Sequence, residues 1–507
     1  MNGQSSEPKR KSQISALLVV GISAVVVLLL GLLLISIMER RWEAQRPALV
    51  LKPIADFEPD NAVWGQNYPR EYESYSATED DTTKTKFGGA FPRDYLEEDP
   101  NLVVLFAGYG FSKEYRQARG HYWAVEDVTN TKRIKSPFNA GTCWTCKSTD
   151  VPRLMDQMGS EAFYAANWYD LKKEITHPIG CQDCHDPKTM NLRITRPALR
   201  EAFAAQGKNI DEATHQEMRS LVCAQCHVEY YFAKSPKNYL TFPWQKGRTV
   251  EDMIAYYDEM DFSDWTHPIS KTPIIKAQHP DFEIYSTGVH AFQGVSCADC
   301  HMPYKSEGGV KFTDHHVQSP LLNIANSCNV CHRWSEQEIK DRVESIQTTV
   351  YNTRRLAEQN LVRAHFDVAA AMEAGIDDDA LKEARQRIRH GQFRWDYVAA
   401  NNGMGFHSPQ ETMRILADAV NDAKEASILA ARLMARKGIP TPSQTPDVAT
   451  REAAWEASQL FVSNTPPNLL TPPTPLEEIA GDANADTPAT GENADTTPAP
   501  ADDSPEK

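Results

Sequence analysis

Every cysteine of this chain lies in a C-x-x-C pair, and this restricts the possible folds more than any other feature of the sequence. Five pairs, beginning at residues 143, 181, 223, 297 and 328, account for all ten cysteines. A disulfide framework would not place each cysteine three residues from another. The bare pairs fit zinc knuckles, redox-active dithiols or attachment sites for a covalent cofactor.

The residue that follows each pair distinguishes these alternatives. Four pairs are followed at once by histidine, in CQDCH, CAQCH, CADCH and CNVCH, whereas the first pair reads CWTCK. C-x-x-C-H is the attachment signature of c-type haem, in which both thiols form thioethers and the histidine faces the iron. Zinc sites need no histidine at that offset, so we predict five covalently bound c-type haems. The predicted thioether cysteines are Cys143, Cys146, Cys181, Cys184, Cys223, Cys226, Cys297, Cys300, Cys328 and Cys331, and the predicted proximal histidines are His185, His227, His301 and His332.

Lys147 occupies the position where the first pair lacks a histidine. One interpretation is a drifted histidine at a haem that has lost its function. The other is an amine ligand, because a lysine that is buried beside a cation can lose its proton and bind iron. A haem with such a ligand and an open distal face can bind a substrate, whereas haems with ligands on both faces only pass electrons.

The number and spacing of the motifs indicate a haem-filled fold. Eleven of the 15 histidines remain after the four proximal ligands, and four distal ligands are needed, so spacing alone cannot choose them. All five motifs fall within residues 143–332, which requires the haems to pack closely enough to relay electrons. Since haems then supply much of the core, we expect a mainly α multihaem cytochrome with little sheet.

The N-terminal region contains one long apolar segment. Residues 14–38 carry no charge, and 25 residues at about 1.5 Å each span a bilayer core. No small-x-small cleavage site is evident, so we expect an uncleaved transmembrane signal anchor after a cytoplasmic segment 1–13, with a long cleaved signal as the alternative. Haem attachment of this kind occurs outside the cytoplasmic membrane, which places residues 39–507 on its periplasmic side.

The rest of the chain divides into three parts by texture. Residues 39–332 hold all the C-x-x-C pairs, and residues 333–463 show helical periodicity over 335–375, 378–400 and 408–437. The third helix begins with the capping-box sequence Ser408-Pro409-Gln410-Glu411. Residues 464–507 hold nine prolines and half of the chain's net charge of −16, which predicts a disordered acidic tail. This acidic balance argues against a nucleic-acid partner.

Several motifs together resemble one known family. CWTCK followed by four C-x-x-C-H motifs, with RGHYWAVEDVTNTKR (119–133), CHVEYYF (226–232), KAQHP (276–280), GVH (288–290), TDHH (313–316) and GFHSP (405–409), resembles the pentahaem, ammonia-forming cytochrome c nitrite reductases. The resemblance covers about residues 85–460. It implies the six-electron reduction of nitrite to ammonium at a lysine-ligated haem that four bis-histidine haems supply with electrons.

The resemblance also implies roles for individual residues. The active-site residues would be Lys147, Arg133, Tyr230 and His279. One calcium ion per chain would be held by the carboxylate of Glu229, the carbonyls of Tyr230 and Lys276, and the side chain of Gln278. The distal ligands would be His316 for the second haem, His121 for the third, His407 for the fourth and His290 for the fifth, with His315 competing with His316.

The sequence also bears on the partners of the protein and on alternative functions. The C-terminal helices resemble the family's dimer-forming helices, so we expect a homodimer. The electron donor would be a quinol-oxidising membrane cytochrome or another carrier. A membrane-anchored, non-catalytic electron carrier also explains five haems and an anchor, but it leaves Lys147 and His279 unexplained. A related reductase acting on sulfite or hydroxylamine would use the same pocket.

Overall fold

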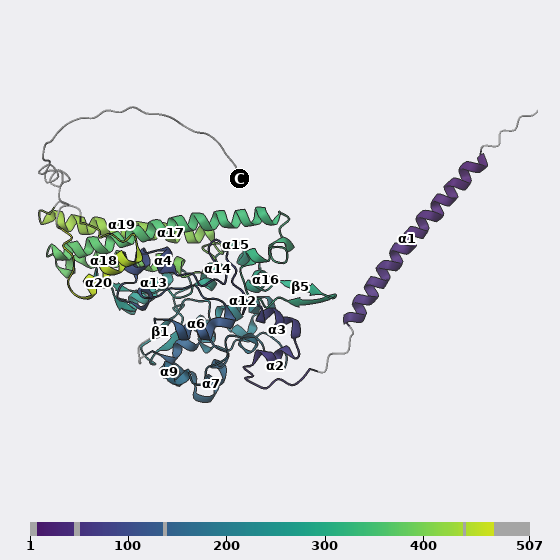
Figure 1. Cartoon of the computed structure of the whole chain (residues 1–507), viewed down its shortest axis with the longest axis horizontal. Coiled ribbons are helices and arrows are strands. Elements are labelled where there is room, and N and C mark those ends of the chain that lie inside the picture. Colours follow the sequence, from purple (N-terminus) through teal and green to yellow (C-terminus); the bar gives the residue numbers. More distant parts are fainter. Residues whose placement is uncertain (1–7, 45–50, 135–138, 440–442, 471–507) are drawn as a thin grey trace, which may run out of the picture.

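The computed structural model describes residues 8–44, 51–134, 139–439 and 443–470 of the chain. Helix α1 (Pro8–Ala44) stands apart from the body formed by the other described residues (Figure 1). Within it, Leu18–Met38 has a mean hydropathy of 3.2 and none of it is buried against the rest of the structure. This helix is long and apolar enough to cross a membrane, as are N-terminal signal sequences.

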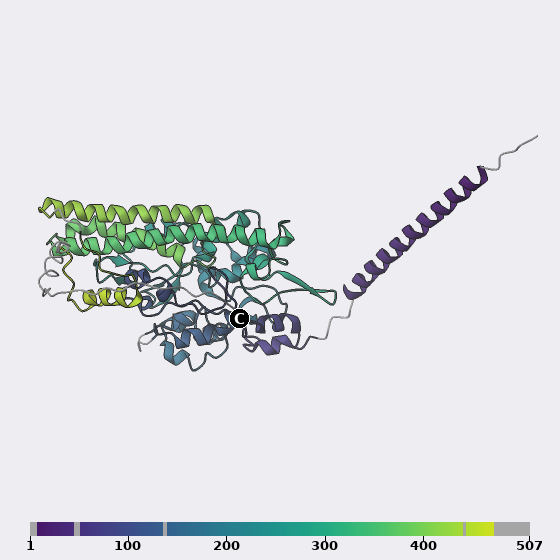
Figure 2. The ribbon, with the colours of Figure 1, turned by 45° about the horizontal axis from the view of Figure 1, so that its top comes forward.

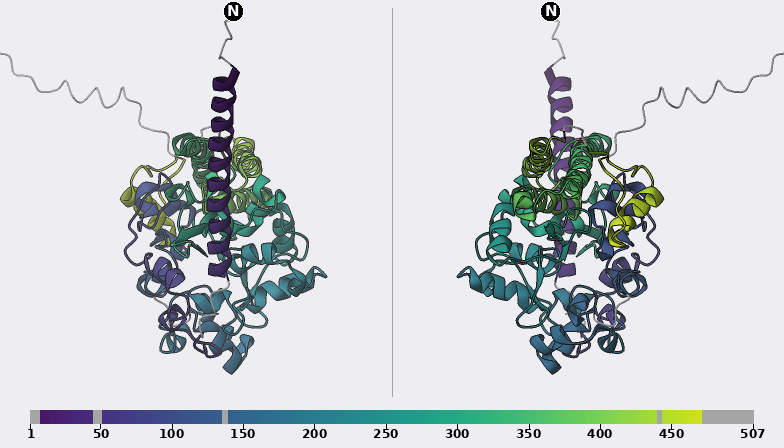
Figure 3. Two further views of the ribbon diagram at one scale, coloured as in Figure 1. Left: turned by 90° about the vertical axis from the view of Figure 1, so that its right-hand side faces the viewer. Right: turned by 90° about the vertical axis from the view of Figure 1, so that its left-hand side faces the viewer.

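Three long helices form one side of the body. Helices α17 (Glu336–Glu373), α18 (Asp378–Ala399) and α19 (Pro409–Arg436) lie side by side in all views (Figures 1 to 3). Ser335 caps α17 through a reciprocal bond with Glu338. Gly391 allows α18 to approach α19 closely, because a Cβ there would lie 3.1 Å from the Cβ of Asp422.

The structure has the three helices that the periodicity predicts, but the N-terminal cap of α19 differs from the prediction. The sequence places the three helices correctly, but the side chain of Ser408 makes no capping bond, and proline at the first position starts α19 instead. Helix α20 (Arg451–Val462) is an addition that the sequence pattern did not reveal. It packs against α5 (Asn101–Leu105), and its Phe461 ring lies 5.9 Å from the ring of Phe366.

The remainder of the body consists of short elements, which confirms a mainly α fold with little sheet. The helices are α2 (Asn61–Gly65), α3 (Pro69–Ser76), α4 (Tyr95–Glu98), α6 (Ala124–Asn130), α7 (Val151–Met158), α8 (Ser160–Ala165), α9 (Trp168–Leu171), α10 (Cys181–Cys184), α11 (Pro197–Ala205), α12 (His215–Ala224), α13 (Val250–Glu259), α14 (Asp281–Ser286), α15 (Val289–Phe292) and α16 (Cys297–His301). The 3-10 turns are η1 (Gly110–Ser112), η2 (His121–Trp123), η3 (Gly141–Trp144), η4 (Ile210–Glu212), η5 (Pro320–Leu322) and η6 (Cys328–Val330).

Three two-stranded antiparallel sheets join these helices. They pair β1 (Tyr231–Ala233) with β2 (Tyr239–Thr241), β3 (Trp265–Thr266) with β4 (Pro273–Ile274), and β5 (Tyr304–Glu307) with β6 (Val310–Thr313). The β5–β6 hairpin projects from the body toward the side where α1 stands (Figure 1). Arg70 on α3 bonds Glu307 at the hairpin's tip over 3.2 Å.

One continuous core joins the short-element region to the long helices. The same cluster of buried side chains runs from Leu96 through Trp144 to Leu416, so the predicted boundary at 332/333 marks a change of texture and not two separate cores. Residues 464–470 also belong to the body. Leu469 is 2% exposed, and its amide donates to Glu373 over 2.9 Å. Residues 464–470 of the predicted tail are therefore part of the body, and residues 471–507 lie outside the described residues.

Candidate active site

All five C-x-x-C pairs lie on single helical turns. The first pair begins on η3, the second is α10 itself, the third begins in the last turn of α12, the fourth opens α16 and the fifth starts η6. Residues three apart on a helical turn lie on the same side, so each pair presents both thiols together. The ten cysteines form no disulfide. This arrangement suits attachment of one haem per pair.

The thiols also show which pairs are neighbours. The thiol of Cys146 in the first pair is a close neighbour of Cys226 in the third and alters its pKa, and Cys223 of the third pair is likewise a neighbour of Cys297 in the fourth. Cys300 of the fourth pair interacts electrostatically with the fifth pair, and the second pair interacts with the third. The attachment sites therefore run in the order first, third, fourth and fifth, with the second beside the third.

Histidines face three of the four C-x-x-C-H histidines at one characteristic distance. Two imidazoles on opposite sides of a metal, each about 2.0 Å from it through nitrogen, have ring centres about 6.3 Å apart. The observed distances between ring centres are 6.3 Å for His185 and His315, 6.3 Å for His290 and His332, and 6.2 Å for His301 and His407. Each pair therefore has room for one iron, which is a direct fit of the chain to its haems.

The remaining C-x-x-C-H histidine is His227 of the third pair, and its neighbour is His121. The pKa of His121 is lowered to about 4, chiefly by burial and also by the adjacent His227. Gly288 brings two further ligand segments together, because a Cβ at Gly288 would collide with the carbonyl oxygen of His407. The motifs GVH and GFHSP, far apart in sequence, thus meet at the fourth and fifth attachment sites.

The geometry favours His315 over the expected His316 as the histidine that faces His185. His316 does not face His185, because its Nε2 lies 3.0 Å from the Oδ2 of Asp81. His315 takes the facing position and is held there by Ser74, whose Oγ accepts its amide over 2.9 Å. The two neighbours follow strand β6, and consecutive side chains of an extended segment point in opposite directions. Only one of them can face the haem.

Arg133 and Tyr230 meet at the first pair, next to Lys147. The charges of Lys147 and Arg133 both lower the pKa of Cys143, against burial, which raises it to about 11. Burial raises the pKa of Tyr230, and the nearby Cys146 and Cys143 add to this rise. The guanidinium of Arg133 lies 4.3 Å from the ring centre of Phe111, which fixes its direction.

His279 lies between the first and third sites. Its ring centre is 4.6 Å from that of His227, and its Nδ1 is 3.3 Å from the Oδ2 of Asp281. The pKa of His279 is lowered to about 4, chiefly by burial and also by His227 and Lys147, against the opposing effect of Asp281. Since the charge of Lys147 reaches both His279 and Cys143, the four expected active-site residues surround one attachment site.

The residues expected to bind calcium also lie together, in the core. The carboxylate of Glu229 accepts the amide of Gln278 over 2.6 Å and the hydroxyl of Tyr257 over 3.1 Å. The side-chain amide of Gln278 in turn donates to the carbonyl of Lys276 over 3.0 Å. Glu229 is buried, and burial raises its pKa well above the usual range. The carbonyl, carboxylate and amide donors are thus adjacent.

More buried acids surround this group than its lysine can neutralise. Burial raises the pKa of Glu283 to about 8 and the pKa values of Asp264 and Asp396 to about 6. The ammonium of Lys276 pairs with Asp396 over 2.9 Å. Uncompensated buried carboxylates are costly, and a hard divalent cation with oxygen ligands would offset that cost. The donor set therefore fits calcium.

The profile of the family described as Cytochrome c552 matches residues 60–469, which is most of the chain. The chain belongs to the cytochrome c552 family. Cytochrome c-552 of Bacteroides fragilis is 50% identical over 457 residues, covering 89% of this chain and 92% of that protein. Cytochrome c-552 of Parabacteroides distasonis is 50% identical over 446 residues, covering 87% and 90%.

A solved structure agrees with this membership of the cytochrome c552 family. Cytochrome c nitrite reductase from Desulfovibrio desulfuricans is 33% identical and has a TM-score of 0.71, covering 75% of this chain and 88% of that chain. Two calcium sites are described for the catalytic subunit of that protein. The family resemblance seen in the haem motifs is therefore confirmed by both sequence and fold.

Two residues near the cytochrome's site were not found from the sequence. Tyr109 stacks on Trp265 with ring centres 4.4 Å apart, and the charge of Arg133 partly offsets the burial that raises its pKa. Nothing in the pattern around residue 109 signals this. Asp281 contacts both His227 and His279, and its place two residues after His279 was the available signal.

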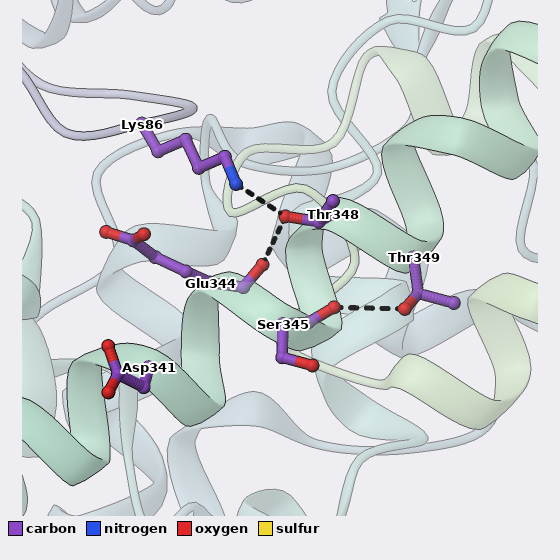
Figure 4. Close-up of a pocket in the computed structure, with 6 residues that line it drawn as sticks. All are labelled: Lys86, Asp341, Glu344, Ser345, Thr348 and Thr349. Atoms are coloured by element: carbon purple, nitrogen blue, oxygen red, sulfur yellow. Dashed lines mark hydrogen bonds between the residues drawn. The ribbon is translucent and has the colours of Figure 1, made fainter.

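A surface pocket elsewhere on the cytochrome is not part of this site. It has a volume of about 360 Å³ and is lined by Lys86, Asp341, Glu344, Ser345, Thr348 and Thr349 (Figure 4). The ammonium of Lys86 donates to the hydroxyl of Thr348 over 2.8 Å, and the hydroxyl of Thr349 donates to a backbone carbonyl. None of the expected site residues lines this pocket, so substitutions of its side chains are suitable controls for substitutions at the site.

Proposed function

We propose that this cytochrome reduces nitrite to ammonium at the haem attached through Cys143 and Cys146, with Lys147 as the proximal ligand. One observation carries the proposal. The four other attachment motifs each have a histidine neighbour for the second face, whereas the lysine motif has Arg133, Tyr230 and His279 around it. A cationic, hydrogen-bonding pocket at the one unusual motif suits a small anion.

The overall reaction is demanding in electrons and protons. Nitrite nitrogen is at +3 and ammonium nitrogen at −3, so one nitrite takes up six electrons and eight protons and yields one ammonium and two water molecules. The haem supplies an open metal site and a route for electrons when it is bound. The adjacency of the first, third, fourth and fifth pairs supports a relay that ends beside Lys147.

The side chains around Lys147 divide the remaining work. A guanidinium is a cation with N–H donors in a planar fork, so we assign Arg133 orientation and electrostatic stabilisation of the nitrite oxygens. His279 is the candidate to donate a hydrogen bond and pass protons, since burial lowers its pKa and keeps the imidazole neutral, with one ring N–H, at neutral pH. Tyr230, whose pKa is raised, keeps its hydroxyl proton and can donate a further hydrogen bond.

We infer the remaining ligands from the same geometry. The distal ligands are His315 for the second haem, His121 for the third, His407 for the fourth and His290 for the fifth. One calcium ion is held by Glu229, the carbonyls of Tyr230 and Lys276, and Gln278. Its role is to neutralise buried acids and to fix the segment that carries Tyr230.

We also propose the setting in which the enzyme works. The apolar helix at the N-terminus keeps the catalytic body on the periplasmic face of the membrane, where a membrane-bound donor delivers electrons. The long helices α17 and α19 pair two copies into a homodimer. N-terminal sequencing of the purified protein tests the anchor, since a mature chain that begins near residue 39 would contradict it.

Product analysis on the purified holoenzyme tests the function. With a reduced viologen dye as donor, we expect about one ammonium per nitrite consumed and an EPR signal from one high-spin haem that nitrite alters. Low-spin signals alone, unchanged by nitrite, would identify an electron carrier instead. A higher kcat/KM for sulfite or hydroxylamine than for nitrite would make nitrite the wrong physiological substrate.

A further inference from the structure

Asp281, at the start of α14, is the meeting point of three segments of the chain. Its Oδ1 accepts the side-chain amide of Asn401 over 2.6 Å and the backbone amide of Asn402 over 2.7 Å. Its Oδ2 accepts the side-chain amide of Asn402 over 3.0 Å. The same Oδ2 lies 2.9 Å from the Nδ1 of His227 and 3.3 Å from the Nδ1 of His279. One buried carboxylate thus holds a haem-motif histidine and an active-site histidine.

The hydrogen bond to Asp281 determines the tautomer of His227. An ionised carboxylate can only accept hydrogen bonds, so the ring nitrogens that face it must carry protons. Nδ1 of His227 is therefore the donor, which leaves Nε2 with the lone pair that an iron ligand needs. His279 lies within ion-pair distance of the same Oδ2, but its Nδ1 makes no hydrogen bond to it.

The carboxylate distinguishes His227 from two other haem-motif histidines. Nδ1 of His185 lies 2.9 Å from the backbone carbonyl of Met190, and Nδ1 of His301 lies 3.0 Å from that of Gln318. Both partners are neutral. A carboxylate partner makes the imidazole more basic and its metal more electron-rich, which favours the oxidised iron.

We propose that Asp281 is a positioning residue that holds His227 with Nδ1 protonated and lowers the reduction potential of the haem attached through Cys223 and Cys226. This proposal rests on His227 being the axial ligand of that haem and is independent of which substrate the enzyme reduces. Because the third site lies between the first and the fourth, its potential regulates how readily electrons reach the Lys147 haem.

The test is an EPR-monitored redox titration of the full-length holoenzyme carrying Asp281→Asn. This variant keeps the size of the side chain and removes its charge. We expect the reduction equilibrium of one low-spin haem to shift at least tenfold toward the reduced form, which is about 59 mV for one electron. The EPR signal that His227→Met changes identifies the third haem. No shift, or a shift confined to another haem, would overturn the proposal.

A second variant gives the opposite sign and guards against loss of structure. Asn402→Ala removes a side-chain donor from Oδ2 and leaves more of the carboxylate's charge for His227. The potential of the third haem should then fall, whereas a merely structural role for Asp281 predicts the same direction for both variants. If Asp281→Asn fails to retain five haems, the potential of the third haem in Asn402→Ala becomes the test. A rise in that potential, or no change, refutes the proposal.

A matched control comes from another carboxylate–histidine pair. The Oδ2 of Asp258 on α13 lies 2.6 Å from the Nε2 of His390 on α18, and neither residue lies in or beside a haem-attachment motif. Asp258→Asn should leave the third haem's potential within the error of the titration. An equal shift in Asp258→Asn would mean that any loss of buried charge moves the potentials, and the specific role of Asp281 would be rejected.

Discussion

The imidazole rings of His185 and His315 lie 6.3 Å apart, the separation that two ligands of one iron require, while the adjacent His316 binds Asp81. We therefore expect His315→Ala to leave the second haem five-coordinate, because no other side chain takes the facing position. EPR should show one additional high-spin haem. His316→Ala is the matched control and should keep the wild-type spectrum. The reverse result would restore His316 as the ligand.

A buried arginine connects the first two attachment motifs. Arg196 is fully buried and pairs with Asp183 of CQDCH, and its guanidinium donates to the carbonyls of Thr145 and Ser148 on either side of Lys147. Arg196→Met leaves Asp183 uncompensated and should lower the free energy of unfolding by about 3–5 kcal/mol. Urea unfolding of the holoenzyme measures this. Arg200→Met, at a partly exposed pair with Asp211, should cost less than about 1 kcal/mol.

A pH effect on stability follows from a histidine pair in the core. His365 is buried, stacks on His267 and has its pKa lowered by burial from 6.5 to about 4, against the hydrogen bond of Gln392. Between these two values the unfolded chain binds the proton and the folded chain does not, so stability falls as the pH drops from about 6.5 to 4. The loss reaches about 3 kcal/mol below that window.

Replacing the histidine isolates this contribution. His365→Gln should flatten the change in unfolding free energy between pH 6.5 and pH 4 by most of that amount, because glutamine has no proton to gain. The exposed His215 provides the control, since His215→Gln should keep the wild-type slope. Equal slopes in all three proteins would show that the buried imidazole does not govern acid stability.

Calcium removal should lower the thermal stability of the protein. A chelator should lower Tm, and added calcium should restore it, with a gain of about 2.7 kcal/mol at a hundred times the dissociation constant. Glu229→Gln should abolish this calcium response, because the buried carboxylate at the centre of the donor set is lost. Asp341→Asn in the surface pocket should respond as the wild type does. A calcium response that survives Glu229→Gln would place the ion elsewhere.

The sequence predicted the haem sites and the long helices well because both depend on local patterns. C-x-x-C-H needs one helical turn, and the periodicity of α17 to α19 directly reflects one buried face. Ligand assignments that depend on tertiary packing could not be predicted from the sequence. His315 and His316 differ by one residue, and the bonds to Ser74 and Asp81 that separate them come from distant segments.

Other failures have the same origin. Ser408 has the residue type of a helix cap, but it is buried and its side chain makes no cap bond. Residues 464–470 have the composition of a tail, yet Leu469 is buried and its amide donates to Glu373 of α17. Asp281 accepts hydrogen bonds from Asn401 and Asn402, about 120 residues away, so no local motif could predict its position.

The most direct test of the account is nitrite turnover by a Lys147→His variant that retains all five haems. A histidine there makes the first motif equal to the other four and removes the ligand on which the proposal rests. We predict that kcat for ammonium formation falls at least tenfold, or about 1.4 kcal/mol in activation free energy, while Lys86→Ala keeps the wild-type rate. An unchanged kcat in Lys147→His would contradict the account, because the lysine would then have no special part in the reaction.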